Sequence, residues 1–237
     1  MKRFILPILC ILFVIVAYSF FFPRTTSFSP SKTLITKKGY TIVEYSNIFT
    51  PEECKTLIEL AKSRDMMQSE VLVNSYGKDS NVDKDARKSK QVWLRDDVHP
   101  LLQRTAEFTK SITKFPIDHQ EETQIVVYEP GGMFVPHFDP CAQIKEDPEF
   151  CKKMNRGAEQ RRYTLLIYLN DEYEEGETEF VNIGVKIKPK AGKGIFFQST
   201  YDDHEIIEQS MHKGCEVKKG NKWIFTKWVH PKPFPVL

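Results

Sequence analysis

Two histidines and one aspartate could bind a metal ion if the fold brings them together. His137 and Asp139 stand two residues apart in the segment Tyr128–Asp139 (YEPGGMFVPHFD). In an extended segment such side chains point to the same face, because strand side chains alternate with period two. His212, far along the chain, supplies a second imidazole. Two imidazoles and one carboxylate on one side of a metal leave the opposite coordination positions open.

Open positions of this kind are what non-haem Fe(II) oxygenases need to bind a cosubstrate and O₂. Lys222 follows His212 by ten residues, across a turn that contains Gly220 and Asn221. A hairpin of that length can bring both side chains into one barrel interior. A buried ammonium is tolerated only when it is paired with an anion, and the distal carboxylate of 2-oxoglutarate would be one. No arginine follows Arg162, so a downstream cation at this site must be a lysine.

His204 is a rival for the third metal ligand. It lies in the acidic run Asp202–Glu205, where a surface histidine is the ordinary interpretation. We favour His212 because Lys222 follows it at hairpin distance. The remaining histidines fall outside the strands expected to line the site: His99, His119 and His230.

The second half of the chain has the pattern of a mainly β fold. Short β-type runs separated by turns span Gln124–Tyr128, Arg162–Leu169, Glu177–Val181, Val185–Pro189, Gly194–Gln198, His204–Gln209 and Trp223–Val229. Many short strands at this spacing indicate a sandwich or closed jelly roll. We therefore predict an α+β, mainly β fold with a double-stranded β-helix (jelly roll) core.

The last strand has a useful parity. Lys222, Ile224, Thr226 and Trp228 would share one face, whereas Trp223, Phe225 and Val229 would share the other. Tyr128 ends the strand that leads into the His-x-Asp motif. Its hydroxyl could donate to the cosubstrate carboxylate, or it could be an ordinary strand aromatic.

Two helices are expected to pack outside this core. Thr50-Pro51-Glu52-Glu53 has the marks of a helix start: a Thr N-cap, Pro at the first position and Glu three residues after the Thr. A preceding strand is expected at Tyr40–Tyr45, and a second helix from about Val98 to Lys114. The polar segment Tyr76–Lys90 has no periodicity, which predicts a mobile loop. The insertion Pro140–Arg161 separates two strands near the His-x-Asp, where a long loop is more often a lid than a defect.

The N-terminus differs in kind from the rest. Lys2 and Arg3 precede an uncharged apolar run from Phe4 to Pro23, which nearly spans a bilayer core of about 30 Å. We favour an uncleaved signal anchor over residues 4–22, with residues 1–3 in the cytosol, a stalk at 23–38 and the domain 39–237 in the lumen. That predicts a single-pass type II protein of the endoplasmic reticulum or secretory pathway. A cleaved signal peptide ending near Ala17–Ser19 is the alternative.

The net charge argues against one class of binding partner, and the cysteines predict one disulfide. A net charge of +2 is too small to indicate a nucleic acid or another acidic polymer as partner. Cys141 and Cys151 bracket a polar loop, and in an oxidising lumen they are our first expectation for a disulfide. Cys54 and Cys215 are expected to be buried thiols. No Cys-x-x-Cys pair is present, which argues against a structural zinc site.

These residues belong to a longer series of ordered motifs, through which the chain resembles the prolyl 4-hydroxylase family of Fe(II)/2-oxoglutarate dioxygenases from Tyr40 to Pro233. The motifs are Phe49–Cys54, Arg87–Ser89 with Trp93-Leu94, Val127–Gly132 with His137–Asp139, Thr164–Asp171, Gly176–Thr178, His212–Val217 and Gly220–Trp223. The resemblance implies an oxygenase core at about residues 120–231.

The resemblance also implies roles for single residues. It implies that His137, Asp139 and His212 hold the iron and that Lys222 pairs with the distal carboxylate of 2-oxoglutarate. It further implies a cosubstrate pocket lined by Tyr128, Thr178 and Trp228. L-ascorbate would restore oxidised iron, and no catalytic group beyond the metal centre is expected.

The implied reaction is hydroxylation of peptidyl proline at C4, with succinate and CO₂ as coproducts. The expected substrate is an extended proline-rich or collagen-like peptide, over which loops 76–90 and 140–161 would close. The family usually has two glycines before Glu-Thr, whereas this chain has Glu175 before Gly176. The loop between Cys141 and Cys151 is also distinctive.

Other functions stay open on the sequence alone. One is a 2-oxoglutarate oxygenase that acts on peptidyl lysine. Another is a catalytically silent jelly-roll binding module, although an intact triad with Lys222 argues against it. A nucleic-acid demethylase on the same scaffold is less favoured, because no basic stripe is evident.

Overall fold

The computed structural model describes residues 30–35, 39–69, 72–73, 81–82, 86–142 and 145–235. Its strands are β1 (Lys32–Ile35), β2 (Thr41–Tyr45), β3 (Met67–Gln68), β4 (Leu72–Val73), β5 (Asn81–Val82), β6 (Lys90–Leu94), β7 (Thr123–Tyr128), β8 (Phe134–His137), β9 (Tyr163–Tyr168), β10 (Glu174–Glu175), β11 (Thr178–Phe180), β12 (Val185–Ile187), β13 (Gly194–Gln198), β14 (His212–Gly214), β15 (Val217–Lys219) and β16 (Lys222–Val229). The α-helices are α2 (Pro51–Lys62), α3 (Pro100–Thr113) and α4 (Pro148–Met154).

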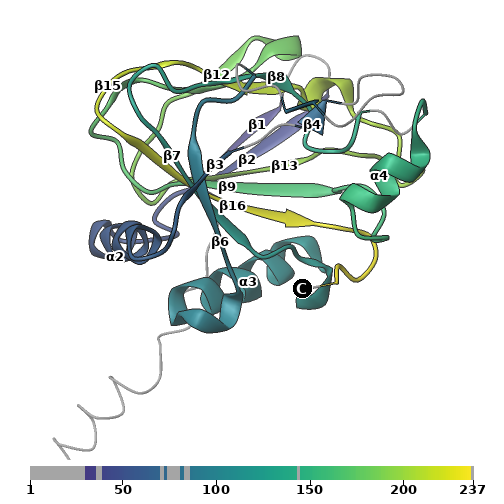
Figure 1. Ribbon diagram of the computed structural model, residues 1–237, viewed down its shortest axis with the longest axis horizontal. Helices are drawn as coiled ribbons and strands as arrows, with labels where there is room; N and C mark the ends of the chain where they lie inside the picture. The colour runs from purple at the N-terminus through teal and green to yellow at the C-terminus, as the bar shows by residue number, and fades with distance from the viewer. Residues whose placement is uncertain are drawn as a thin grey trace, which may run out of the picture.

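Two antiparallel sheets form the body of the domain. The major sheet has eight strands in the order β1-β2-β13-β9-β16-β7-β6-β3, and the minor sheet has four in the order β12-β11-β14-β8. Apolar side chains fill the space between them, among them Val126 and Tyr168 of the major sheet and Phe180 of the minor sheet. This arrangement confirms the expected mainly β, jelly-roll-like fold (Figure 1).

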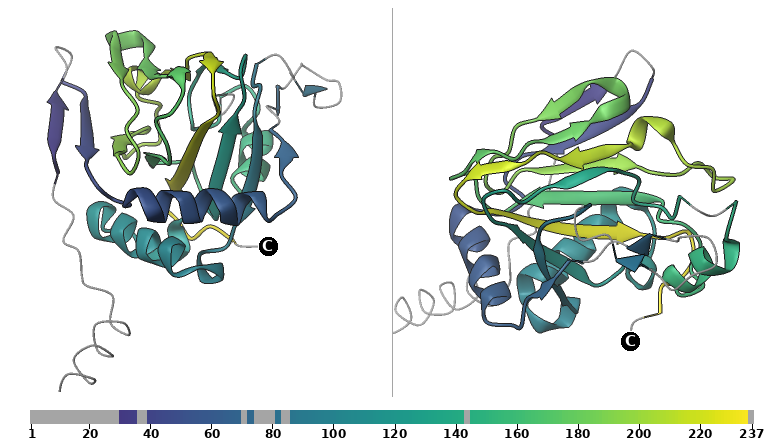
Figure 2. Two further views of the ribbon diagram at one scale, coloured as in Figure 1. Left: turned by 90° about the vertical axis from the view of Figure 1, so that its left-hand side faces the viewer. Right: turned by 45° about the horizontal axis from the view of Figure 1, so that its top comes forward.

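Helices α2 and α3 cover the outer face of the major sheet (Figure 2). Leu57 of α2 and Leu102 of α3 have no exposed surface, and they share one apolar core with Phe225 of β16. The predicted start of α2 is confirmed, because Glu53 N donates to the Thr50 hydroxyl at 3.2 Å and Thr50 N donates to the Glu53 carboxylate at 3.0 Å.

The parity predicted for β16 is also confirmed. Trp223 and Phe225 belong to the core under the helices, whereas Ile224 belongs to the core between the sheets. Lys222 is 2% exposed and Trp228 is 6% exposed, and both face the space between the sheets. Strand β16 therefore directs Lys222 into the space between the sheets.

The strand predicted at His204–Gln209 is wrong. An isolated bridge joins Thr200 to Ile206, and Glu208–Ser210 forms a 3-10 turn. His204 has a φ of 70°, which is left-handed and incompatible with a continuous strand. The acidic run before it is a turn.

The loop predicted at Tyr76–Lys90 is shorter than expected. Lys90 begins β6, which pairs with β7, and Arg87 forms a bridge with Phe134 of β8. Lys88 N also donates to the carbonyl of Met133 at 2.9 Å. Residues 86–90 are therefore part of the sheet framework, while residues 76–80 and 83–85 lie outside the described part of the chain.

The insertion Pro140–Arg161 has structure of its own, because it contains α4 and the predicted disulfide. Cys141 and Cys151 are bonded, with their Cα atoms 5.6 Å apart. The first-choice pairing from the sequence is thus confirmed. Of the two thiols predicted to be buried, Cys54 is buried and Cys215 is only partly so.

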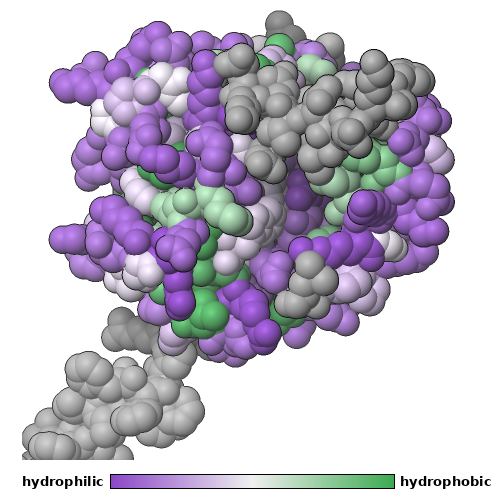
Figure 3. Space-filling model, viewed as in Figure 1, coloured by the Kyte–Doolittle hydropathy of each residue, from purple (hydrophilic) through white to green (hydrophobic). Residues whose placement is uncertain are grey.

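At the N-terminal side, Lys32–Ile35 pairs with β2 as an edge strand, although these residues were expected in the stalk. The predicted membrane anchor at residues 4–22 lies outside the described residues. Within the described ranges, no helix has the length and apolar character needed to cross a bilayer. The face of the molecule in Figure 3 is mostly hydrophilic, as expected when apolar side chains fill the two cores.

Candidate metal and cosubstrate site

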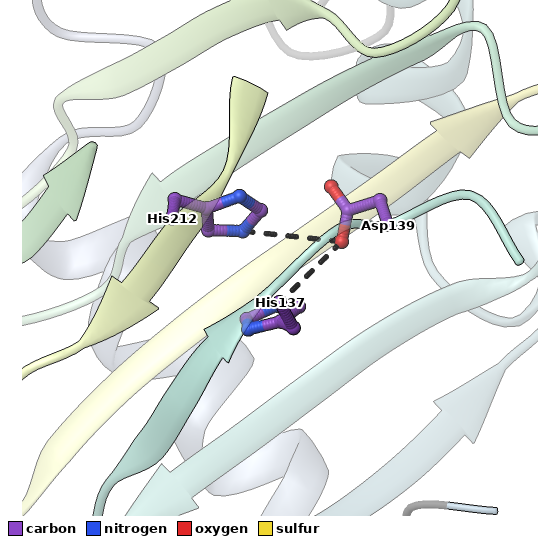
Figure 4. A group of neighbouring side chains, drawn as sticks. All are labelled: His137, Asp139 and His212. Atoms are coloured by element: carbon purple, nitrogen blue, oxygen red, sulfur yellow. Dashed lines mark ion pairs between the residues drawn. The ribbon is translucent and has the colours of Figure 1, made fainter. Parts of the chain in front are cut away.

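His137, Asp139 and His212 meet between the two sheets (Figure 4). His137 lies on β8 opposite His212 of β14 in the antiparallel register. Asp139 Oδ1 lies 3.9 Å from the Nε2 atom of each histidine. One ligand atom from each residue falls within 4.8 Å of the others. Donors about 2.1 Å from one ion lie about 3 to 4 Å apart, so this spacing suits a single metal.

Backbone hydrogen bonds fix the orientation of both imidazoles. His137 Nδ1 lies 2.8 Å from the carbonyl oxygen of Val135, and His212 Nδ1 lies 2.9 Å from that of Ser210. A carbonyl oxygen can only accept, so the proton of each ring is on Nδ1. The lone pair is then on Nε2, the atom that faces Asp139. Metal-binding histidines are oriented by bonds of this kind.

The site electrostatics favour a neutral imidazole beside a charged carboxylate. Burial, followed by the charge of His212, lowers the pKa of His137 to about 3. Burial raises the pKa of Asp139, but the nearby His212, His137 and Arg161 outweigh it and the net pKa is lowered. Both groups are therefore in the protonation state that binds a cation.

Asp139 is held by a hydroxyl that the sequence did not single out. Thr164 Oγ1 donates to Asp139 Oδ2 at 2.5 Å, so Oδ1 is the oxygen left to face the imidazoles. Thr164 lies in β9, whose inward face could have been found from strand parity. Its contact with Asp139 could not, because Asp139 lies outside any strand and 25 residues earlier along the chain, where strand parity does not place it.

Lys222 is a buried cation on the same side of the sheet. For its Nζ atom the described residues provide neither a hydrogen bond nor an ion pair. Nζ lies 5.1 Å from the ring centre of Tyr128 and 6.0 Å from that of Tyr168. Burial lowers the pKa of Lys222 to about 8. A lysine in this state needs an anionic ligand.

Lys222 and the triad line one pocket of about 450 Å³, its open mouth included. The three residues predicted to surround the cosubstrate, Tyr128, Thr178 and Trp228, line the same pocket. Thr178 Oγ1 accepts a hydrogen bond from the Tyr168 hydroxyl at 2.7 Å, which leaves the proton of Thr178 able to point into the pocket. Tyr168 was not predicted as a site residue.

Trp228 lines the pocket from the same strand as Lys222 and contacts Arg161, which is not itself a lining residue. The Arg161 guanidinium stacks 3.8 Å from the ring centre of Trp228. Two hydrogen bonds of 2.5 and 2.8 Å join it to the carboxylate of Glu121, which also contacts His230 Nε2 at 2.8 Å. Trp228 Nε1 is buried and has no hydrogen-bond partner among the described residues.

The remaining histidine candidates are elsewhere. His204 lies 3.4 Å from Glu159 and its side chain is 38% exposed, so it does not join the triad. His99 caps α3, where its Nδ1 accepts from Leu101 N at 3.2 Å. Of the two histidines, His212 therefore lies beside His137 and Asp139, whereas His204 does not.

These observations allow a test of whether the residues fit Fe(II) and 2-oxoglutarate. The donor set is two imidazoles and one carboxylate, which leaves coordination positions open for a chelating cosubstrate and O₂. A partnerless ammonium and an oriented hydroxyl lie in the same pocket and suit the distal carboxylate of a diacid. The residues fit both groups.

Comparison with known proteins gives a consistent result. The family model described as the 2OG-Fe(II) oxygenase superfamily matches residues 123–230. A "Putative prolyl 4-hydroxylase" of Acanthamoeba polyphaga mimivirus is 30% identical over 190 residues, which cover 80% of this chain and 74% of the relative. "Probable prolyl 4-hydroxylase 10" of Arabidopsis thaliana is 33% identical over 212 residues, which cover 81% and 69%.

A solved structure shares the fold. The viral collagen prolyl hydroxylase from Paramecium Bursaria Chlorella virus-1, in its 2OG complex, superposes with a TM-score of 0.61 at 24% sequence identity. The match covers 79% of this chain and 94% of that chain.

Proposed function

The chain belongs to the prolyl 4-hydroxylase family of the 2OG-Fe(II) oxygenase superfamily, and from this we propose that it hydroxylates peptidyl proline at C4. The reaction consumes 2-oxoglutarate and O₂ and releases succinate and CO₂. One observation carries the proposal: a His-Asp-His triad and a partnerless buried lysine share a single pocket. An inactive module would have no use for an unpaired ammonium at 2% exposure.

The roles proposed for the residues follow from their positions. His137, Asp139 and His212 hold Fe(II), which supplies the oxidation of the substrate C–H bond. Lys222 binds the distal carboxylate of 2-oxoglutarate, and Thr178 adds a hydrogen bond from the hydroxyl that Tyr168 orients. Tyr128 and Trp228 close the sides of this pocket and exclude water from the reacting groups.

The proposed substrate is an extended proline-rich or collagen-like peptide. Relatives carry the name prolyl 4-hydroxylase, and one structural neighbour is a prolyl hydroxylase bound to a peptide fragment. A polyproline II segment has no internal hydrogen bonds, so its backbone is free to bind a groove. We also propose that ascorbate sustains repeated turnover.

Mass spectrometry of peptides incubated with the full chain, Fe(II), 2-oxoglutarate and ascorbate tests this function. The panel contains collagen-like, hydroxyproline-rich glycoprotein-like and lysine-containing peptides. We expect a gain of one oxygen on proline. Oxygen on lysine with proline unchanged would instead identify a lysyl hydroxylase.

Succinate release separates an enzyme from a silent binding module. Wild type should release succinate in the presence of the peptide, and His137→Ala should not. Equal background from the two proteins would refute the enzyme. Omission of ascorbate should leave the first turnover intact and slow the later ones.

We further propose that the protein is anchored in the endoplasmic reticulum or secretory-pathway membrane through residues 4–22, with its domain in the lumen. The Cys141–Cys151 disulfide supports an oxidising compartment. Protease treatment of intact microsomes should leave the domain uncut, and cleavage without detergent would contradict this orientation.

A further inference from the structure

The carboxylate of the triad is supported differently from its two histidines. His137 and His212 lie on β8 and β14, which pair with each other, so a strand ladder holds both. Strand β8 ends at His137, and Asp139 lies beyond it, outside any strand. A ligand on irregular backbone needs another device to hold it in place.

That device is the side chain of Gln160, which is 1% exposed. Gln160 Oε1 accepts a hydrogen bond from Cys141 N at 2.8 Å, and Gln160 Nε2 donates to the Cys141 carbonyl oxygen at 3.0 Å. A single amide therefore satisfies both backbone groups of Cys141. This residue is two positions from Asp139, and only Pro140, whose ring fixes φ, lies between them.

The contacts continue along the chain after Gln160. Arg161 Nη1 donates to the Asp139 carbonyl oxygen at 3.3 Å, and Thr164 Oγ1 donates to its carboxylate at 2.5 Å. The segment 160–164 thus holds the segment 139–141 at three points. Because these points lie within one short segment, a shift of Cys141 relative to Gln160 also shifts Asp139.

The disulfide closes this arrangement into a ring. Cys151 is 1% exposed and lies in α4, and its bond to Cys141 ties that helix to the end of the triad segment. Asn155, the C-cap of α4, donates to Gln160 Oε1 at 3.3 Å. The path from Cys141 through Cys151 and Asn155 therefore returns to Cys141 through Gln160.

We propose that Gln160, together with the Cys141–Cys151 disulfide, is a clamp that positions Asp139 for metal binding. The inference rests on the proposed metal centre and adds a positioning residue to it. Gln160 does not contact the metal in this proposal. It acts through the backbone of Cys141 and Pro140, and the disulfide limits how far that backbone can move.

Metal affinity of the full chain tests the clamp without reference to turnover. Gln160→Met keeps the length of the side chain and removes both hydrogen bonds to Cys141. Calorimetric titration with Mn²⁺ alone should show a dissociation constant 10- to 100-fold above that of wild type, the range for residues that orient metal ligands. Thermal unfolding without metal verifies that the variant is folded.

Gln120→Met is the matched control. Gln120 is also a buried glutamine, at 3% exposure, and its amide donates to Ala106 of α3 rather than to the triad segment. We expect it to lose stability but to bind Mn²⁺ as wild type does. Equal affinity in wild type and a folded Gln160→Met would overturn the clamp, as would an equal loss in both glutamine variants.

Two more variants keep the proposal testable if Gln160→Met does not fold. Gln160→Glu retains an acceptor for Cys141 N and should lose less affinity than the methionine variant. Cys141→Ser with Cys151→Ser should weaken Mn²⁺ binding, and its loss should not add to that of Gln160→Glu, because both act on one element. If the two losses in Mn²⁺ affinity add fully, the clamp is refuted but the metal centre is not. A wild type that binds no Mn²⁺ would refute the metal centre as well.

Discussion

Two buried lysines on one strand predict opposite effects of the same substitution. Lys222 and Lys227 lie on opposite faces of β16, at 2% and 0% exposure. Lys227 donates to both oxygens of Asp96 at 2.7 Å. Lys222 has no such partner among the described residues. Lys222→Met should therefore stabilise the ligand-free protein, whereas Lys227→Met should destabilise it.

The magnitudes follow from the charges. Burial lowers the pKa of Lys222 from 10.5 to about 8, which corresponds to about 3 kcal/mol at about 1.4 kcal/mol per tenfold change in proton affinity. Lys222→Met should raise the free energy of unfolding by up to this amount at pH 7. Removal of one member of a buried ion pair costs about 3 to 5 kcal/mol of stability. The loss caused by Lys227→Met should lie near the lower end of this range, because Asp96 is 21% exposed.

The pH dependence separates this cause from a change in packing. The folded pKa of Lys222, about 8, lies below its unfolded value of 10.5, so the unfolded chain binds more protons between these two values. Wild-type stability therefore rises with pH across that window. The gain in unfolding free energy of Lys222→Met over wild type is therefore largest below pH 8 and vanishes above about pH 10.5.

Urea denaturation of the full chain, with wild type and both variants at several pH values, measures these differences. With Mn²⁺ already present at a saturating concentration in every sample, addition of 2-oxoglutarate should stabilise wild type by mass action and stabilise Lys222→Met much less. A Lys222→Met protein less stable than wild type at pH 7 would refute the partnerless buried ammonium. So would an advantage that does not depend on pH.

Three further predictions concern the site and its framework. The dissociation constant for 2-oxoglutarate, measured calorimetrically with Mn²⁺, should rise about tenfold per pH unit above about pH 8, because Lys222 must be protonated to bind the carboxylate; a flat profile to pH 10 would contradict this. His212→Ala should abolish Mn²⁺ binding and His204→Ala should leave it unchanged, since only the former side chain is in the triad; an equal loss in both would revive His204 as a ligand. Glu175→Gly should raise the free energy of unfolding by about 0.5 to 1 kcal/mol in denaturant titrations, because at the Glu175 φ of 63° the strain of a side chain outweighs the extra chain entropy of glycine. A loss of stability would show that the interactions of the Glu175 side chain outweigh that strain.

Local patterns in the sequence were enough to predict much of the framework that surrounds the site. The capping box at Thr50 and the strand of Lys222 each depend on residue types a few positions apart, and the two cysteines of the disulfide are ten residues apart. Glu175 has a left-handed φ, which favours glycine and accounts for the glycine that the family usually has at this position. Such features are predictable because their cause is a short stretch of backbone.

The errors in predicting strands arose where a strand's pairing partner is remote in the sequence. Strand β6 was missed because the residues before it are polar, and its pairing with β7 overrides that local signal. His204–Gln209 was predicted as a strand because it contains two isoleucines, but it has a single bridge rather than a ladder partner. A strand is defined by its neighbour, which short-range patterns do not specify.

By itself, the sequence determined which residues could bind iron and a diacid, since donor types and strand parity are local properties. Only the tertiary structure decided which atoms support them. Thr164 on Asp139, Tyr168 on Thr178 and Gln160 on Cys141 are contacts between segments whose separation along the chain says nothing about their distance. Packing of one sheet on the other creates these contacts, and hydrogen-bond geometry then fixes them.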